Sequence, residues 1–266
     1  MMQLEPHGTD TFVGTGPEYP WGGLYGGQIV AQGLRACGLT VESQFLPHSL
    51  HAYFIRPGDA SEPIRFEVDR LRNGRSFVTR QVVARQSTGA ILTMIASFQV
   101  AEEAADVQAA TMPPVDGPDS FEPGSWTDLI DRRILPPTAT AGREQAWMRI
   151  TGPVDDDPLL NACGIAYMSD DLPSEPVRAL HPAWTPHSDE EGGSDEDGGA
   201  FMSVSLDHAV WFHRPAKATA WHFEDFLAGG LTGSRGLAAG NLFDLDGIHI
   251  ATVAQETLLR LRRPAM

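Results

Sequence analysis

Two parts of this chain repeat each other at a fixed distance. The segment Ser-Leu-His-Ala-Tyr-Phe-Ile-Arg-Pro ends at Pro57, and a slightly longer copy ends at Pro215. These two prolines are 158 positions apart, and so are Gly89 and Gly247, each of which opens an apolar run. This period is too long for a solenoid repeat, so we expect a duplicated domain.

The duplication predicts two α+β units, each with a helix rich in small residues followed by antiparallel strands. The units are predicted at 1–110 and 111–266, and the stretch 102–125, rich in Ala, Pro, Asp and Glu, is predicted to be a linker. After an irregular lead-in over 1–21, a helix is predicted at 24–38 from its apolar spacing. Strands are predicted in the first unit at 48–56, 63–71, 76–86 and 90–100. In the second unit we expect a short helix at 126–133, a strand at 143–151, a helix at 156–171 and strands near 201–214, 219–228, 232–244 and 247–262.

The acidic charge limits the partners of this chain. The net charge is −16 at pH 7, which argues against nucleic acid because phosphate binding needs a basic surface. Residues 187–199 hold six acidic residues and four glycines without an apolar side chain, so we expect an acidic mobile loop there. A ligand that carries phosphate would need a local basic patch, and two are available: Arg70, Arg72 and Arg75, or Arg260, Arg262 and Arg263.

Targeting signals and cysteine usage indicate a cytoplasmic protein. The chain starts without a basic and apolar leader, and it contains no run of 18 apolar residues, so we expect no membrane span. Cys37 and Cys163 each lie in a mainly apolar segment. A disulfide between them stays open at this point, although two buried thiols in a reduced compartment fit the pattern better.

Five segments stand in order along the chain: Tyr-Gly-Gly-Gln-Ile-Val-Ala-Gln (25–32), His-Ser-Leu-His-Ala-Tyr-Phe-Ile-Arg-Pro-Gly-Asp (48–59), Tyr-Met-Ser-Asp (167–170), Ser-Leu-Asp-His-Ala-Val-Trp-Phe-His-Arg-Pro (205–215) and Ala-Gln-Glu (254–256). In this order and spacing, the chain resembles the type II acyl-CoA thioesterases, a double-hotdog family, from about residue 20 to 263. The resemblance implies two tandem antiparallel sheets, each wrapped around a central helix. It implies a hydrolase of fatty acid and lipid metabolism that cleaves fatty acyl-CoA to fatty acid and CoA. It implies no cofactor, because CoA enters as part of the substrate.

Three residues match the catalytic positions of that family. Asp170, in the Tyr-Met-Ser-Asp segment, would activate a water for attack on the thioester. Gln255 would orient that water through its amide, and Ser205 would complete the cradle with its hydroxyl. An alternative interpretation, without a catalytic role, is that Asp170 is an ordinary helix-end residue with Asp171 as its surface neighbour. Ser205 as a covalent nucleophile is disfavoured, because a strand serine lacks the sharp turn of Gly-x-Ser-x-Gly enzymes.

Four further residues are predicted to bind the substrate. Gly26 and Gly27 begin the first helix, where free backbone N–H groups could bind an oxyanion or a phosphate, unless they serve only close packing. Arg75 belongs to one of the basic patches. His208 is predicted to line the site or to be structural, since the side chains of Asp207 and His208 should point to opposite faces of their strand unless a bulge intervenes.

Other readings of the sequence stay open. No metal is expected, because His48, His51 and His213 lack the pairings of a zinc site. A hotdog enoyl-CoA hydratase or dehydratase would bind a similar substrate but needs an Asp–His pair at one double bond. A third alternative is a non-catalytic acyl-CoA-binding protein. An incomplete sandwich has exposed faces, so we expect a homodimer or a higher homo-oligomer.

Overall fold

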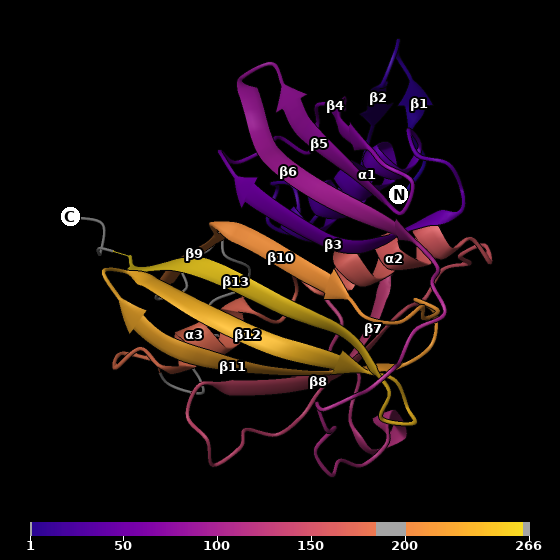
Figure 1. The fold of residues 1–266 in the computed structure, drawn as a ribbon. Helices are drawn as coiled ribbons and strands as arrows, with labels where there is room; N and C mark the ends of the chain where they lie inside the picture. Colours follow the sequence, from indigo (N-terminus) through magenta and orange to yellow (C-terminus); the bar gives the residue numbers. More distant parts are fainter. Residues whose placement is uncertain (1, 185–200, 263–266) are drawn as a thin grey trace.

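In the computed structural model, which describes residues 2–184 and 201–262, thirteen antiparallel strands form one continuous sheet (Figure 1). The strand order is β1-β2-β4-β5-β6-β3-β10-β13-β12-β11-β8-β7, and β9 pairs with β13 beside β10. The predicted mobile loop at 187–199 lies outside the described residues. The elements are β1 Glu5–Pro6, β2 Thr11–Gly14, α1 Gly26–Gly38, β3 Phe45–Phe54, β4 Ile64–Asn73, β5 Phe77–Gln86, β6 Gly89–Val100, η1 Pro118–Ser120, β7 Ile130–Ile134, β8 Arg143–Ile150, α2 Pro158–Met168, α3 Ser174–Ala179, β9 Phe201–Ser205, β10 Asp207–Phe212, β11 His222–Thr232, β12 Arg235–Phe243 and β13 His249–Leu261.

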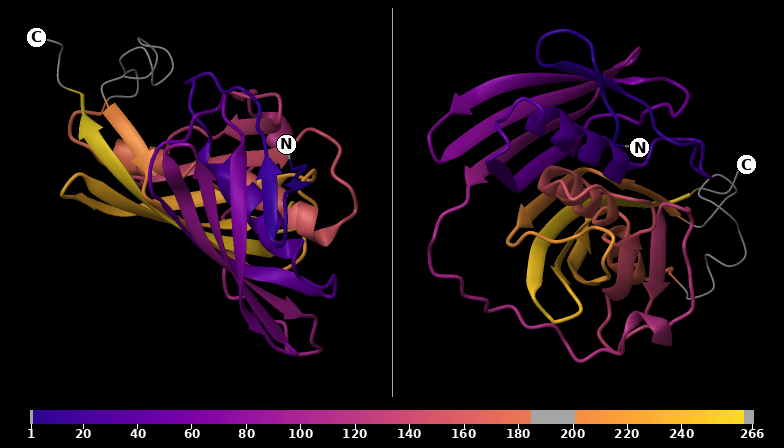
Figure 2. Two further views of the ribbon diagram at one scale, coloured as in Figure 1. Left: turned by 90° about the horizontal axis from the view of Figure 1, so that it is seen from above. Right: turned by 90° about the vertical axis from the view of Figure 1, so that its right-hand side faces the viewer.

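The strands of the two predicted units are hydrogen-bonded to each other through β3 and β10. The central pair of this ladder is His51 and Ala209, and their numbers differ by 158, the period of the sequence repeat. Edge strands expose unpaired backbone groups, and this pairing satisfies two such edges at once. The predicted tandem sheets are therefore parts of one sheet, with the two sets of strands on either side of this ladder (Figure 2).

Helix α1 is buried on nearly all sides, which explains its small residues. It packs against β3, β5 and β6 on one side and against α2 on the other. A Cβ atom on Gly38 would lie 2.3 Å from Cδ2 of Leu159, and one on Gly27 would lie 2.3 Å from the carbonyl oxygen of Tyr167. The two helices are therefore antiparallel, and the start of α1 lies against the end of α2.

Most of the predicted elements are confirmed, but the short helix predicted at 126–133 is wrong. Strand β7 runs through this segment and pairs with β8, with Asp131 directly opposite Arg149. The two side chains form an ion pair at 2.9 Å, and Arg133 also contacts Asp131. Cross-strand charge pairs of this kind favour a strand where the local sequence carries little helical periodicity. The short helix α3 was not predicted.

The stretch between the two units packs on the outer side of the sheet. Its apolar residues Met112, Val115 and Phe121 contact a cluster that includes Trp147. The indole nitrogen of Trp147 donates a hydrogen bond to the carbonyl oxygen of Asp116 at 2.9 Å. The predicted linker therefore covers apolar surface of β8, β11 and β12 as well as joining the two sets of strands.

Cys37 on α1 and Cys163 on α2 are free and buried. Burial raises the pKa of both thiols well above the usual range. The prediction of two buried thiols is confirmed, and they act as small apolar side chains.

Candidate active site

The structure brings Asp170, Ser205 and Gln255 together at the end of α2. The hydroxyl of Ser205 lies 3.3 Å from Oδ1 of Asp170 and donates to it. The amide Nε2 of Gln255 donates to the Ser205 hydroxyl at 2.9 Å. Asp170 follows α2, whereas the other two residues come from β9 and β13, which pair with each other. A carboxylate, a hydroxyl and an amide from three separate elements therefore share one buried polar cluster.

A β-bulge at Leu206 determines which residues of this segment reach the cluster. Ser205 is opposite Thr257 and Ala209 is opposite Ala254, so four steps along one strand match three along the other. The extra residue turns Ser205 and His208 to the same face, although they are three positions apart. The carboxylate of Asp207 is engaged elsewhere, because its Oδ1 accepts a hydrogen bond from the backbone N–H of Glu256.

Burial gives Asp170 the properties of a general base. Its exposed fraction is 8 %, and burial raises its pKa from an ordinary value of 3.8 to about 7. Hydrogen bonds from the backbone N–H of Gly27, from Ser205 and from Gln255 oppose this rise, and the neighbouring charge of Asp171 adds to it. A base is most effective when its pKa lies near the working pH, so this carboxyl is well placed to take a proton from water at neutral pH.

The two glycines at the start of α1 lie against the carboxylate of Asp170: Gly26 leaves room for it, and Gly27 donates a hydrogen bond to it. A Cβ atom on Gly26 would lie 2.5 Å from Oδ2 of Asp170 and 3.0 Å from Cζ of Phe54. The N–H of Gly27 donates to this carboxylate, so it is engaged by the protein itself. An oxyanion or a phosphate, which we predicted to bind at these N–H groups, would therefore have to compete with the Asp170 carboxylate for the N–H of Gly27.

His208 joins the cluster as a fully buried side chain. Its Nδ1 lies 2.6 Å from Oε1 of Gln255, and its Nε2 lies 2.9 Å from the hydroxyl of Ser169. Its exposed fraction is 0 %. The prediction that His208 binds substrate is therefore wrong, because this side chain has no exposed surface that could contact a substrate. The alternative prediction of a structural residue fits its contacts with Gln255 and Ser169.

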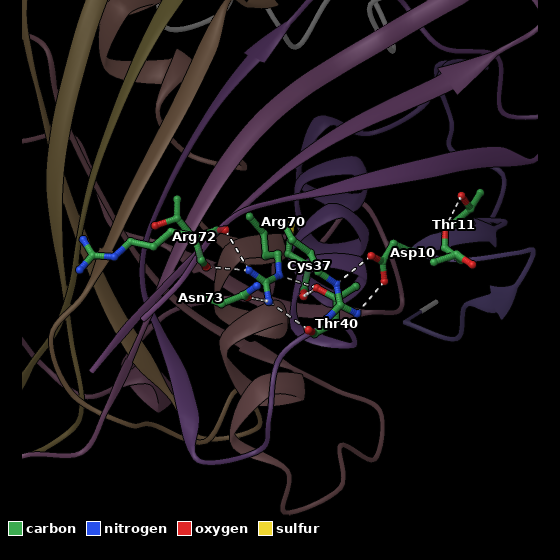
Figure 3. Close-up of polar contacts among 10 residues, drawn as sticks. Asp10, Thr11, Cys37, Thr40, Arg70, Arg72 and Asn73 are labelled. Carbon is green, nitrogen blue, oxygen red and sulfur yellow. Dashed lines mark hydrogen bonds and ion pairs between the residues drawn. The ribbon is translucent and has the colours of Figure 1, made fainter. Parts of the chain in front are cut away.

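Arg75 lies at the opposite end of α1 from Asp170. It is exposed in the connection between β4 and β5. Asn73, the last residue of β4, is held by Arg80, which also contacts Thr40 just beyond the end of α1. Figure 3 labels Asn73 and Thr40. A helix of 13 residues is about 20 Å long, so Arg75 is separated from the carboxylate by roughly that distance.

Aromatic side chains and a second carboxylate surround the cluster, and sequence reasoning missed them. Asp171 is not a surface neighbour: its side chain is 5 % exposed and pairs with Arg132 at 2.9 Å, and the indole of Trp126 also donates to it. The hydroxyl of Tyr25 donates to the carbonyl oxygen of Tyr167 at 2.9 Å. Five rings pack together where α1 starts and α2 ends, namely Tyr19, Trp21, Tyr25, Trp126 and Tyr167. Only the crowding of aromatic residues over 19–25 hinted at this packing in the sequence.

Neither a metal site nor a membrane span is evident in the described ranges. Within residues 2–184 and 201–262, no three His, Cys, Asp or Glu side chains are grouped so as to hold a metal ion. His48 contacts the hydroxyl of Ser97, and His213 contacts that of Thr252. No helix in the same part of the chain is long and apolar enough to cross a membrane.

Comparisons with known proteins identify the two halves of the chain. Residues 16–99 match the family model for the acyl-CoA thioesterase N-terminal domain. Residues 104–259 match the model for the acyl-CoA thioesterase C-terminal domain. Together these two matches cover most of the sequence.

Full-length relatives agree with the family models. Acyl-CoA thioesterase 2 of Haemophilus influenzae is 30% identical over 98% of this chain and 96% of its own. Human acyl-coenzyme A thioesterase 8 is 31% identical over 98% of this chain and 88% of its own. The crystal structure of acyl-CoA thioesterase II TesB2 from Mycobacterium marinum is 34% identical, covers 100% of this chain and 97% of its own, and superposes with a TM-score of 0.83.

A more distant structure supports the fold alone. A conserved protein with a hot dog fold from Alicyclobacillus acidocaldarius superposes with a TM-score of 0.79 at 19% identity, over 98% of this chain and 97% of its own. The large antiparallel sheet with few helices is thus a hotdog-type fold. The two matched domain models and the full-length relatives place this chain in the acyl-CoA thioesterase family.

Proposed function

We propose that this protein hydrolyses fatty acyl-CoA to a free fatty acid and CoA with a water that Asp170 activates. The observation that carries the proposal is the buried carboxyl of Asp170, whose pKa burial raises to about 7, in contact with Ser205 and beside Gln255. Membership of the acyl-CoA thioesterase family supplies the substrate class.

In the proposed mechanism, ionised Asp170 takes a proton from water as the water oxygen attacks the thioester carbon. The tetrahedral intermediate then collapses, the C–S bond breaks and CoA leaves as a thiolate, which takes up the proton held by Asp170 and so restores the base. The Gln255 amide and the Ser205 hydroxyl orient the water, while the N–H of Gly27 fixes the carboxylate. Charge-assisted hydrogen bonds of this kind are stronger than neutral ones and keep the base in place.

The direct test is release of free thiol from a panel of acyl-CoAs of increasing chain length. A hydrolase releases thiol, whereas a pure binder shows saturable binding without thiol. A hydratase would instead remove the conjugated absorbance of an enoyl-CoA. The hydratase alternative needs His208 beside Asp170, but its Nδ1 is 3.9 Å from Oδ1 of Asp170 and is engaged by Gln255.

The pH dependence of kcat/KM should reveal the ionisation of Asp170. Only the ionised carboxylate can take a proton, and its pKa is about 7. We therefore expect kcat/KM to fall about tenfold for each pH unit below 7 and to level off above it. Loss of the thioester absorbance, followed from pH 5 to 9, measures this profile. A flat profile between pH 5 and 7 would contradict the role of Asp170.

Gly26→Ala should displace the base. The new Cβ would lie 2.5 Å from Oδ2 of Asp170 and 3.0 Å from the ring of Phe54, so the carboxylate must move. We expect kcat to fall at least tenfold, because catalytic geometry tolerates little misplacement. Thiol release and thermal unfolding measure the two effects. Gly33→Ala is the matched control: its Cβ would meet the flexible end of Met94 at 3.1 Å and Cγ1 of Val82 at an ordinary contact distance of 3.4 Å, so it should keep its activity.

Several finer features belong to the same proposal. We infer that 1–110 and 111–266 are two hotdog units, and the packing of α1 on β5 and β6 supports this for the first unit. Three other features stay predictions. These are substrate contacts at Gly26, Gly27 and Arg75, assembly as a homodimer or higher homo-oligomer, and cytoplasmic residence. Size-exclusion chromatography with light scattering measures the oligomeric state.

A further inference from the structure

His208 is buried directly behind the proposed catalytic cluster. It lies on β10 with an exposed fraction of 0 %, and both ring nitrogens have hydrogen-bond partners. Nδ1 is 2.6 Å from Oε1 of Gln255, and Nε2 is 2.9 Å from the hydroxyl of Ser169. This side chain contacts the catalytic candidates but is itself shielded from substrate.

The hydrogen-bond partners of His208 determine which nitrogen of its imidazole ring carries the proton. The Nε2 of Gln255 donates to Ser205, so its Oε1, which can only accept, faces Nδ1 of His208. Nδ1 must therefore carry the proton, and in the neutral ring Nε2 accepts from the hydroxyl of Ser169. This hydroxyl has one proton and also lies 3.1 Å from the carbonyl oxygen of Ala166, toward which it would turn if the ring became charged. Burial lowers the pKa of His208 to about 4, which keeps the ring neutral at physiological pH.

The hydrogen bonds run in one direction, and the backbone joins the two ends of the chain of contacts at Ser169 and Asp170. His208 donates to Gln255, Gln255 donates to Ser205, and Ser205 donates to Asp170. Ser169 precedes Asp170 in the chain and binds the far side of the His208 ring. The backbone segment that carries the base thus also anchors the imidazole, and the amide of Gln255 can keep its orientation only while Nδ1 donates.

We propose that His208 is a positioning residue: its Nδ1–H holds the amide oxygen of Gln255, so that the NH₂ group faces Ser205 and the water. The proposal rests on the proposed function for its catalytic consequence. Without this donor, the amide is free to turn and to present its oxygen instead. The amide could then no longer donate toward the reacting water or an oxyanion.

A pair of variants of equal size separates this role from simple packing. Both His208→Asn and His208→Leu lose the contact with Ser169, and both are uncharged, but only asparagine can donate to Oε1 of Gln255. We expect His208→Asn to keep kcat within about fivefold of the wild type. His208→Leu should lower kcat by about 100-fold, the cost of one misplaced donor in a catalytic site, with KM changed less than about threefold. Equal kcat values for the two variants would overturn the proposal.

A double-mutant cycle tests whether His208 acts through Gln255. In a Gln255→Ala background, the change from His208→Asn to His208→Leu should have almost no further effect on kcat, because the amide is gone. If the difference between the two His208 variants stays near 100-fold in that background, His208 acts by another route and the proposal fails.

A spectroscopic measurement on the unaltered protein keeps the inference independent of activity. With ¹⁵N-labelled histidine, the ring signals of His208 are assigned by their loss in His208→Asn. The wild type should show a protonated Nδ1 and an unprotonated Nε2 from pH 6 to 8. A ring protonated at Nε2 would overturn the proposal even if acyl-CoA is hydrolysed. If no acyl-CoA is hydrolysed, an Nδ1–H ring still supports the orientation of Gln255, and the proposed function alone fails.

Discussion

Asp170→Asn is expected to lower kcat by about 10³-fold. It is also expected to remove a pH-dependent loss of unfolding free energy that the ionised carboxylate causes. An amide cannot take a proton from water, and general bases contribute about 10²–10⁴-fold to enzymatic rates. Asparagine has nearly the same shape, so the surrounding contacts of Ser205 are disturbed little. Thiol release from acyl-CoA measures the activity. A variant with unchanged kcat would exclude Asp170 from the mechanism.

The effect on stability follows from the raised pKa of Asp170. In the unfolded chain this carboxyl loses its proton near pH 3.8, but in the folded protein it does so only near 7. Between these values the folded state holds one more proton, so its stability falls as the pH rises and is lowest above pH 7. Asparagine lacks this dependence. From pH 5 to 8, we therefore expect the unfolding free energy of the variant to rise by about 3 kcal/mol relative to the wild type.

Urea unfolding of both proteins at pH 5 and pH 8 measures this difference. Because the variant and the wild type share all other titratable groups, the contributions of those groups to the pH dependence cancel. Glu224 is buried, and its pKa is also raised by burial, but it is present in both proteins. Asp171→Asn is the matched control at the next position. Because Asp171 is paired with Arg132, its loss should destabilise the protein at both pH values. A relative stability of Asp170→Asn that does not change with pH would contradict the raised pKa.

The sequence was sufficient to select three residues that the structure brings into contact, because these residues lie in linear motifs. Asp170 follows a helix, and Ser205 and Gln255 lie on strands whose patterns are clear, so the resemblance could be transferred residue by residue. The role of His208 was harder to predict. Strand alternation alone places it opposite Ser205, and only the bulge at Leu206 brings the two side chains to one face.

Other features depend on contacts between distant segments, which a local pattern does not contain. The antiparallel packing of α1 on α2 brings Gly27 to Asp170 at one end of α1. The contacts of Arg80 with Thr40 and Asn73 link the other end of α1 to the connection that carries Arg75. Asp171 resembles a surface residue in the sequence, but Arg132 on β7 neutralises it in the interior. Since that segment was predicted to be a helix, this partner could not be inferred.

The largest expected loss of stability is for Arg80→Met, at the end of α1 away from the site. Arg80 is 2 % exposed, and its five N–H groups all have acceptors, which are uncharged: the hydroxyl and carbonyl of Thr40, the carbonyls of Arg72 and Thr79, and the side chain of Asn73. The hydroxyl of Thr40 in turn donates to the carbonyl of Cys37 in the last turn of α1. A buried cation thus satisfies the negative end of this helix.

Methionine preserves much of the volume of Arg80 but leaves several buried acceptors without donors. Each unsatisfied buried group costs about 1–3 kcal/mol, and partial relaxation lowers the sum, so we expect a loss of about 3–5 kcal/mol in urea unfolding. Arg70→Met is the control on the neighbouring strand (Figure 3). Arg70 makes two hydrogen bonds to Asp10, but its side chain is 48% exposed, so this loss should stay near or below about 1 kcal/mol. Equal losses in the two variants would mean that Arg80 does not hold the end of α1, and that the burial of its guanidinium adds nothing to the fold.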